Sequence, residues 1–442
     1  MNIAMFTNTF PPQVSGVSVS VARLASGLRA RGHSVLIVAP EFPHASADEP
    51  DVLRMPALQR VGGSDLSVPT VASRRLDERI AAFAPDLVHA HHPFLLGDTA
   101  LRIASSRGIP VVFTYHTRYE VYAQAGMPGN STVMQVALGI ALGYSNLCDA
   151  VIAPSESTAR FLRANEVTPP IAVIPSGIPI SALVGGDGPG MRRALGIPPD
   201  AFLVGHVGRL AVEKNLDYLA GALTSFLARH PTAHALIAGD GPMRRRLARM
   251  FERAGLGGRV HLAGVVTGRS LADAYAAMDL FAFSSLSETQ GLVLAEAMAA
   301  GVPVVALSGP GTEEIVVSGQ NGQLLPADAA PSAFAGAIDR ILSMDRAARE
   351  KMSLAARRTA DNFSVERVVE RTATLYRATL DRRLENPDPR RWKRMMRRAA
   401  IERDLIANLA HAIGGVVAPS NGLARVSGVI PIRVRGGRSD GS

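Results

Sequence analysis

Cysteine is almost missing from this chain, because among its 442 residues only Cys148 is a cysteine. A single cysteine excludes an internal disulfide and suggests no cysteine-bound metal, which fits a protein of a reducing compartment. Uninterrupted apolar runs of about 18 residues or more are also missing, so no transmembrane helix is expected. The chain opens with a strand-like segment instead of a charged leader and a small-residue cleavage site, which predicts a cytoplasmic location.

The residues that are present describe a folded protein of two domains. Hydrophobic residues make up 47% and charged residues 19% of the sequence, which is typical of a globular chain rather than a disordered one. A length of 442 residues exceeds what one ordinary hydrophobic core holds, so two domains are the natural expectation.

Strand-like runs alternate with helical ones along the chain, as in parallel sheets covered by helices. The runs are 2–6, 34–39, 87–90, 110–114, 150–153 and 171–174 in the first half, and 203–207, 233–238, 260–262, 280–283 and 304–307 in the second. The glycine-rich stretch 178–190 between the two sets is interpreted as a linker. The predicted fold class is therefore α/β, with two Rossmann-like doubly wound domains facing each other across a cleft.

Two glutamates flank the predicted start of a helix. Glu288 and Glu296 are separated by seven residues and follow the strand-like run 280–283. If the helix begins near Gly291, the free N–H groups of its first turn favour an anion such as a diphosphate. Carboxylates accept hydrogen bonds in pairs, so one glutamate can hold a hexose and the other a ribose. The alternative is one glutamate near a helix start for the macrodipole and another on a solvated face.

Two cations follow another predicted strand, 203–207. Arg209 offers a planar fork for phosphate oxygens, and Lys214 offers a mobile point charge. Both lie where a strand passes into a helix, so they can converge on a ligand at the strand ends. The alternative is two solvated cations after a strand.

A glycine opens the first predicted helix. Residues 2–6 form a strand that Pro11-Pro12 ends, and Ser15-Gly16 begins a helix that continues through Leu28. Gly16 permits close backbone approach of a phosphate or an acceptor to the helix start.

The three segments, in the order in which they occur along the chain, resemble the retaining family-four glycosyltransferases with the GT-B fold, whose acidic motif is Glu, seven residues, Glu. The resemblance runs from residue 1 to about residue 380. It implies a hexosyltransferase that takes glucose or mannose from a nucleoside-diphosphate sugar, such as UDP-glucose or GDP-mannose. It also implies an acceptor-side domain over 1–178, a nucleotide-sugar domain over 179–364, and C-terminal helices from about 365 that return to the first domain.

The resemblance assigns roles to individual residues. His116, which follows a strand within the segment Tyr115-His116-Thr117-Arg118-Tyr119-Glu120, is expected to contact the donor sugar, and its alternative is a capping or packing histidine. The expected catalytic residues are His116, Glu288, Arg209 and Lys214. The expected substrate-binding residues are Gly16, Val266, Gly291, Leu292, Val293 and Glu296, with Val266 near the nucleobase.

The chemistry implied is same-face transfer with retention of anomeric configuration. Positive charge develops on the sugar while the diphosphate leaves as an anion, which Arg209, Lys214 and the helix start would stabilise. No cofactor and no metal are expected, since the family generally uses none. His89 and His91 should lie on one face of a strand and His92 on the other, which also disfavours a metal site.

Two other functions share this plan. Nucleotide-sugar epimerases use the same pair of domains but carry a different pattern of acidic residues. A non-enzymatic sugar-nucleotide sensor would have lost Glu288, or Arg209 and Lys214, and all three are present. A glycosyltransferase is therefore the preferred prediction.

The acceptor is indicated first by charge. Lys and Arg number 47 against 38 Asp and Glu, and the excess of 9 favours anionic surfaces. The tail 386–442 contains a basic segment, 390–398, with Trp392 and two methionines, which resembles an interfacial membrane segment. No nucleic-acid-binding module accompanies it. The alternative is a basic, partly disordered extension without catalytic importance.

A second indication lies in the motifs. Glu288-Thr289-Gln290-Gly291, with the segment around His116, resembles the subgroup that glycosylates diacylglycerol and related glycolipids, whereas many members carry Glu-Gly-Phe-Gly. The expected acceptor is thus a membrane glycolipid or diacylglycerol, reached by peripheral contact with the inner face of the cell membrane. The alternative is a soluble saccharide or small-molecule acceptor.

Overall fold

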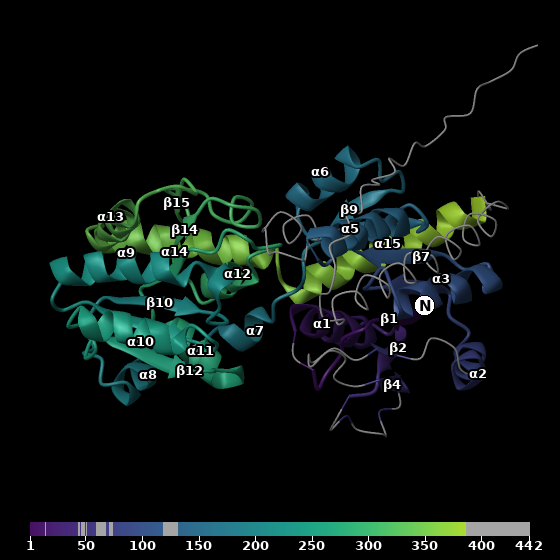
Figure 1. Ribbon diagram of the computed structural model, residues 1–442, viewed down its shortest axis with the longest axis horizontal. Helices are drawn as coiled ribbons and strands as arrows, with labels where there is room; N and C mark the ends of the chain where they lie inside the picture. The colour runs from purple at the N-terminus through teal and green to yellow at the C-terminus, as the bar shows by residue number, and fades with distance from the viewer. Residues whose placement is uncertain are drawn as a thin grey trace, which may run out of the picture. The chain divides into compact units, whose positions relative to one another are not determined.

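The computed structural model describes residues 1–13, 15–42, 45, 49, 51–58, 68–69, 74–117 and 131–385 (Figure 1). Two parallel β-sheets organise these residues, and each sheet has a hydrophobic cluster on either face. Residues 118–120 of the histidine segment and the basic tail 386–442 lie outside the described residues.

Strands from the first half of the chain form the first sheet, in the order β3-β2-β1-β6-β7-β8-β9. The strands are β1 Asn2–Phe6, β2 Ser34–Pro40, β3 Val52–Met55, β6 Leu87–Ala90, β7 Val111–Thr114, β8 Ala150–Ala153 and β9 Ile171–Val173. The helices between them are α1 Gly16–Ala30, α2 Arg74–Phe83, α3 Leu96–Arg107, α5 Ser131–Ser145 and α6 Glu156–Ala164. A separate short antiparallel pair joins β4 Ala57–Leu58 to β5 Val68–Pro69.

The second sheet has the order β12-β11-β10-β13-β14-β15. Its strands are β10 Leu203–Val207, β11 His234–Ala238, β12 Val260–Gly264, β13 Leu280–Phe283, β14 Val304–Leu307 and β15 Gly322–Leu325. The helices are α7 Ile180–Leu183, α8 Gly188–Ala194, α9 Leu216–Arg229, α10 Arg244–Arg253, α11 Gly268–Ala277, α12 Leu292–Ala299, α13 Pro331–Leu342 and α14 Arg346–Asp361, with a 3-10 turn η2 at Val212–Lys214.

The strand order of both sheets determines where a ligand can bind. In the first sheet the order reverses between β1 and β6, and in the second it reverses between β10 and β13. Helices leave toward opposite faces at such a point, which opens a crevice at the carboxyl ends of the strands. A ligand-binding site is therefore expected at the loops after β1, β6, β10 and β13.

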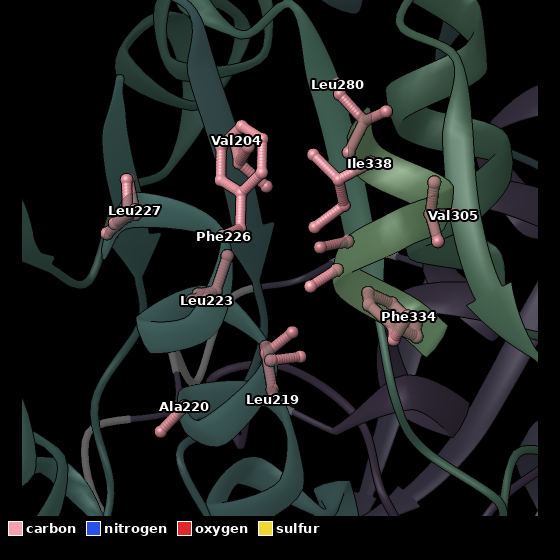
Figure 2. Packing of buried hydrophobic residues seen from close by; sticks show 14 of the residues in the cluster. Val204, Leu219, Ala220, Leu223, Phe226, Leu227, Leu280, Val305, Phe334 and Ile338 are labelled. Carbon is pink, nitrogen blue, oxygen red and sulfur yellow. The ribbon is translucent and has the colours of Figure 1, made fainter. Parts of the chain in front are cut away.

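Apolar residues on the two faces of each strand explain why the sheets are covered on both sides. Strands β6, β7, β8, β13 and β14 are buried at every position, as expected of parallel strands between two layers of helices. On one face of the second sheet, Leu223 and Phe226 of α9 pack with Phe334 of α13 over Val204 (Figure 2). Each such side chain contributes about 1.5–3 kcal/mol when fully buried.

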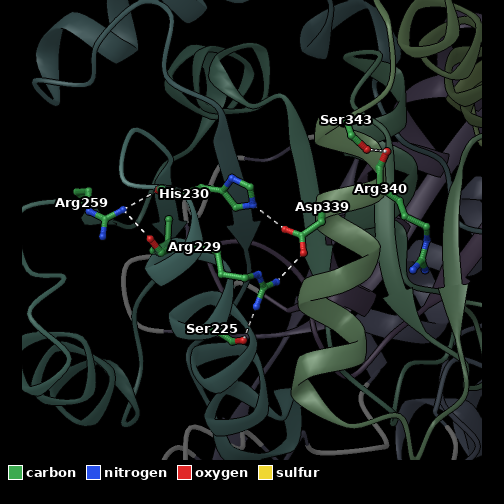
Figure 3. A network of polar contacts seen from close by, with 8 residues as sticks. Ser225, Arg229, His230, Arg259, Asp339, Arg340 and Ser343 are labelled. Carbon is green, nitrogen blue, oxygen red and sulfur yellow. Dashed lines mark hydrogen bonds and ion pairs between the residues drawn. The ribbon is translucent and has the colours of Figure 1, made fainter.

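A polar network ties the end of α9 to α13 (Figure 3). Asp339 accepts a hydrogen bond from Arg229 Nη2 at 2.6 Å and contacts His230 Nε2 at 2.8 Å. All three side chains are about one third or more exposed, so the contacts orient the helices and add little net stability.

Helix α15, Val365–Glu385, packs against the first sheet although it follows the second sheet in sequence. Val368, Val369, Ala373 and Tyr376 form its buried stripe and join the cluster of β1, β2 and α1. Gly27 of α1 allows the close approach, because a Cβ there would lie 2.4 Å from Val369 Cγ2. The last described helix thus covers one face of the sheet with which the chain begins.

The glycine-rich stretch interpreted as a linker is well packed rather than loose. It contains α7 and the start of α8, and Ile178 forms a parallel bridge with Ser364. A Cβ on Gly186 or Gly188 would lie 2.2 or 2.3 Å from a backbone oxygen of α11. These two glycines therefore serve close packing of backbone on α11, and a flexible connection is not their purpose.

Candidate functional site

A cleft of about 380 Å³ lies at the carboxyl ends of the strands, between loops of the two sheets. The first sheet contributes Ser15, Gly16, Val17, His116 and Ser176. The second contributes His206, Val207, Gly208, Arg209, Lys214, Phe283, Glu288, Thr289, Gln290, Gly291, Leu292 and Val293. Eight of the ten predicted site residues line this cleft; Glu296 and Val266 are not among its lining residues.

Lys214 and Glu288 form the polar centre of the cleft. Lys214 Nζ donates to Glu288 Oε1 at 2.5 Å, and the two side chains are 24% and 17% exposed. Their loops are held by Ser284, whose Oγ donates to Lys214 O at 3.0 Å, and by Asn215, whose Nδ2 donates to Ser284 O at 3.2 Å. The loops after β10 and β13 are thus joined, and this fixes the cation beside the carboxylate.

Arg209 has more freedom than Lys214. Its side chain is 70% exposed and contacts Glu213, four residues further along the same loop, at 3.5 Å. An exposed contact of this kind is weak, so the guanidinium can exchange Glu213 for phosphate oxygens at little cost. The arginine therefore lies on the cleft as an available anion-binding group.

The start of α12 forms another wall. Gly291 is its N-cap residue, with a left-handed φ of 62° and no side-chain capping bond. A side chain at this position would be strained, and its Cβ would lie 3.0 Å from Leu294 Cδ1. The first N–H groups of a helix have no acceptor within it, so those of Leu292 and Val293 can bind an anion in the cleft.

Glu296 lies on the same helix, further from the cleft. Tyr275 donates from its hydroxyl to Glu296 Oε2 at 3.1 Å, and Arg23 of α1 lies 3.9 Å from Oε1. Burial raises the pKa of Glu296, while Arg23 and Tyr275 act in the opposite direction. The assignment of Glu296 to substrate binding stays a prediction. Val266 is half-buried in the cluster under α12, and its nucleobase contact stays a prediction too.

His116 reaches the cleft from the loop after β7. Its Nε2 lies 3.0 Å from His91 Nδ1, and the two rings stack with centroids 5.3 Å apart. Burial, with smaller effects of His92 and His89, lowers the pKa of His116 to about 3. The ring is therefore neutral near pH 7, and it can donate one hydrogen bond without carrying charge.

His206 is a cleft residue that the sequence analysis missed. Its Nδ1 donates to Ala282 O at 3.1 Å, because a carbonyl can only accept, and Nε2 is buried without a partner among the described residues. Burial lowers the pKa of His206 to about 4. The available signal was its position at the carboxyl end of β10, two residues before Gly208.

Gln290 and Ser176 were also missed. Gln290 Oε1 accepts from Ser176 N at 2.6 Å, and its Nε2 donates to Ser176 Oγ at 3.0 Å. Ser20 of α1 donates to the same Ser176 Oγ at 3.0 Å. The acidic motif is thereby hydrogen-bonded to residues of the first sheet's side of the cleft.

The three neighbouring histidines do not share one face. His89 and His91 stack with ring centroids 4.0 Å apart, whereas His92 turns away and accepts from Asn8 N at 3.1 Å. Within the part of the chain that the structure describes, no group of three or more His, Cys, Asp or Glu could hold a metal ion. Over the same residues, no helix is long and apolar enough to cross a bilayer.

Two sequence families match the chain, one on each half. The family described as Glycosyltransferase Family 4 matches residues 14–182, and that described as Glycosyl transferases group 1 matches residues 189–359. The chain is 31% identical over 392 residues to a GDP-mannose-dependent alpha-mannosyltransferase of Mycobacterium tuberculosis, covering 87% of this chain and 98% of that one.

The relatives include an enzyme that glycosylates a lipid. An alpha-monoglucosyldiacylglycerol synthase of Streptococcus pneumoniae is 28% identical over 73% of this chain and 75% of its own. The resemblance to lipid-glycosylating enzymes predicted from the motifs is thus confirmed.

Solved structures give the same fold. Anabaena Alr3699/HepE in complex with UDP has a TM-score of 0.70 and 22% identity, over 86% of this chain and 100% of that one. Sucrose-phosphate synthase from Thermosynechococcus elongatus has a TM-score of 0.69 and 24% identity, over 85% and 98%. The α/β prediction of a GT-B fold with two doubly wound sheets is confirmed.

Proposed function

Because the chain belongs to the family-four and group-one glycosyltransferases, we propose that this hexosyltransferase moves a hexose from a nucleoside-diphosphate sugar to a lipid hydroxyl. The observation that carries the proposal is the convergence of Arg209, the Lys214–Glu288 pair and the start of α12 on one cleft. In this cleft, groups that can bind an anion and the carboxylate of Glu288 lie within reach of one ligand.

The diphosphate lies against the start of α12 and Arg209. A helix start supplies N–H donors and a partial positive charge, and the guanidinium adds two parallel donors. These groups stand ready before the reaction begins, so they stabilise the charge that develops on the leaving phosphate oxygen. Gly16, at the start of α1 across the cleft, lets a backbone approach the same diphosphate.

The hexose lies between Glu288 and His116. Glu288 accepts hydrogen bonds from sugar hydroxyls and offsets the positive charge of an oxocarbenium-like transition state. Lys214 donates to the carboxylate and holds it in place, and its ammonium group can also reach the phosphate. Neutral His116 donates a hydrogen bond to the sugar from its remaining ring nitrogen.

Transfer proceeds on one face of the sugar, with retention. The bond from the anomeric carbon to the diphosphate oxygen breaks while the bond to the acceptor oxygen forms. The acceptor's proton passes to the leaving phosphate oxygen, so no separate protein base is required. Neither a metal ion nor another cofactor has a role in this scheme.

The donor is UDP-glucose or GDP-mannose, and the acceptor is diacylglycerol or a membrane glycolipid. The relatives' names support a GDP-mannose donor and a diacylglycerol acceptor, since one name contains GDP-mannose and another contains monoglucosyldiacylglycerol. The Glu-Thr-Gln-Gly form of the acidic motif and the basic tail 386–442 support a lipid surface on the cytoplasmic side of the cell membrane. A soluble saccharide acceptor is the competing proposal.

Nucleotide release from each donor tests this proposal. UDP-glucose and GDP-mannose are supplied separately, with and without anionic vesicles that contain diacylglycerol. We expect vesicle-dependent release from one donor together with a new glycolipid. Release that is independent of lipid, with a soluble glycoside as product, would establish the competing acceptor.

A further inference from the structure

Two buried histidines stand behind His116 and are not assigned a role by the proposed function. His91 is 3% exposed and contacts His116 through the two ring nitrogens, Nδ1 and Nε2, at 3.0 Å. His89 is fully buried and stacks on His91. His89 lies in β6 and His91 directly follows this strand, at which the order of the first sheet reverses.

His89 is held at both of its nitrogens. Nδ1 lies 2.6 Å from the hydroxyl of Tyr376 on α15, and Nε2 lies 2.7 Å from Thr114 Oγ1 at the end of β7. A ring with two such partners cannot rotate without breaking a buried hydrogen bond, which costs about 1–3 kcal/mol. His89 therefore provides a fixed surface on which His91 stacks.

The contact between His91 and His116 requires one ring to donate and the other to accept. Burial lowers the pKa of His91 well below its ordinary value, and the neighbouring histidines lower it further. Both rings are neutral near pH 7, and a neutral imidazole has one N–H and one lone pair. The proton position on His91 therefore fixes the proton position on His116.

We propose that His91 is a positioning residue that sets the ring orientation and tautomer of His116, so that His116 presents Nδ1–H to the cleft. The proposal rests on the proposed contact of His116 with the donor sugar. It adds that this contact is a donated hydrogen bond whose direction is determined by a residue outside the cleft.

The ring nitrogen of His91 that does not contact His116 indicates the direction. His91 Nε2 is buried without a partner among the described residues. A proton on Nε2 would therefore be a buried donor without an acceptor, whereas a proton on Nδ1 is donated to His116 Nε2 at 3.0 Å.

Proton positions then follow in sequence. His91 Nε2 has no acceptor among the described residues, so the proton of His91 is on Nδ1. That N–H donates to His116 Nε2, which leaves the proton of His116 on Nδ1. A neutral donor aimed at the sugar helps to hold the hexose in the orientation that transfer requires, and it adds no positive charge beside the oxocarbenium-like transition state.

Substitution by asparagine, glutamine and leucine separates this role from packing. The amide of Asn lies near the position of Nδ1, whereas that of Gln lies near Nε2 and cannot reproduce the bond to His116. We expect His91→Leu and His91→Gln to lower kcat about tenfold or more with donor KM nearly unchanged, a part of the loss seen when a direct donor is removed. His91→Asn should recover most of the turnover.

The second sheet offers a matched control. His234 Nδ1 lies 3.0 Å from His261 Nε2, and these rings also stack with centroids 5.3 Å apart, remote from the cleft lining. His234→Leu removes the same kind of contact. We expect kcat and KM of this variant to stay at wild-type values once folding is confirmed by its melting temperature.

A spectroscopic measurement separates failure of this inference from failure of the proposed function. Nitrogen chemical shifts of the His116 ring should report one tautomer, with the proton on Nδ1, in the wild-type protein and in His91→Asn, and a mixture in His91→Leu. The same tautomer in all three proteins, or equal turnover of His91→Asn, His91→Gln and wild type, would overturn the inference. If instead His116→Ala keeps wild-type turnover, the proposed contact with the sugar is wrong, whatever the tautomer.

Discussion

At the scale of single residues, the cleft combines one ionised pair with neutral histidines. Lys214 and Glu288 are in direct contact, whereas burial lowers the pKa of His116 to about 3 and that of His206 to about 4. The charged side chains that line the cleft are thus Arg209, Lys214 and Glu288, whereas the buried histidines are neutral near pH 7 and can contribute hydrogen bonds only.

Replacing Glu288 tests the carboxylate. Glu288→Ala removes the group that offsets charge on the sugar and leaves Lys214 without its partner, so kcat should fall about 10²–10³-fold. Donor KM should change much less, because Arg209 and the start of α12 remain. Steady-state kinetics with Glu252→Ala, an exposed position on α10, as control measures both. Wild-type turnover in Glu288→Ala would refute its role.

The buried histidines also predict how stability depends on pH. The pKa values of His89 and His116 are lowered to about 3 and that of His92 to about 4, all by burial. The unfolded chain therefore binds more protons than the folded one below about pH 6.5, and stability is lost as pH falls through this range.

Urea denaturation at pH 7 and pH 5 measures the effect. At pH 5 each such histidine should cost about 2 kcal/mol of unfolding free energy. His92→Asn keeps an acceptor for the Asn8 N–H but cannot titrate. The free energy of unfolding of this variant should therefore fall between pH 7 and pH 5 by about 2 kcal/mol less than that of the wild-type protein. Equal stability of the wild-type protein at both pH values contradicts the interpretation.

At the scale of elements, the loop before α12 connects the two sides of the cleft. Gln290 makes two hydrogen bonds to Ser176, which also binds Ser20 of α1. The neighbouring Gly291 is the N-cap of the helix whose N–H groups face the cleft. Gln290 therefore orients the anion-binding helix start relative to α1.

Removing the hydrogen bonds between Gln290 and Ser176 should lower kcat/KM for the donor. Gln290→Leu removes two neutral hydrogen bonds, each with a net value of about 0.5–1.5 kcal/mol, so kcat/KM for the donor should fall about tenfold. Gln290→Asn, whose amide is one methylene short of Ser176, serves as the polar control and should be similarly impaired. Unchanged kcat/KM in both variants would show that the contact is incidental.

Most strands of the two sheets could be predicted from the sequence, and the exceptions have physical causes. The runs 87–90, 150–153, 203–207, 280–283 and 304–307 match strands of the structure to the residue. Strand β3 was missed because Val52–Met55 includes Arg54, which is buried and bonded to Glu49 and Pro11 O. Strand β15 was missed because it begins with Gly322 and Gln323, so its sequence lacks the continuous apolar run of the neighbouring strands.

The site was predictable where it follows strand ends and not where it depends on contacts between distant residues. Arg209, Lys214, Glu288 and Gly291 stand after predicted strands, so the switch-point rule places them in the cleft. The contact of Glu296 with Arg23 and the contact of His89 with Tyr376 join residues that are far apart in sequence. No local pattern reveals such pairs, since only the folded sheet brings them together.

At the scale of the whole molecule, the proposed membrane contact belongs to the basic tail, which lies outside the described residues. Replacing the six cations of 390–398 by glutamine should weaken binding to anionic vesicles at least about tenfold, because each cation near such a surface contributes about 1 kcal/mol. Vesicle sedimentation at low and high salt measures this. Binding that survives the replacement would remove the tail from the proposal.

The most direct test of the central claim is transfer of labelled hexose by the wild-type protein and by a variant with both Arg209→Gln and Lys214→Gln. The account predicts a labelled glycoside from UDP-glucose or GDP-mannose with the wild type. The double variant should lose about 10²-fold or more in kcat, because the leaving diphosphate has lost two of its stabilising charges. Wild-type transfer rates in the double variant, or no transfer from either donor by the wild type, would contradict the account.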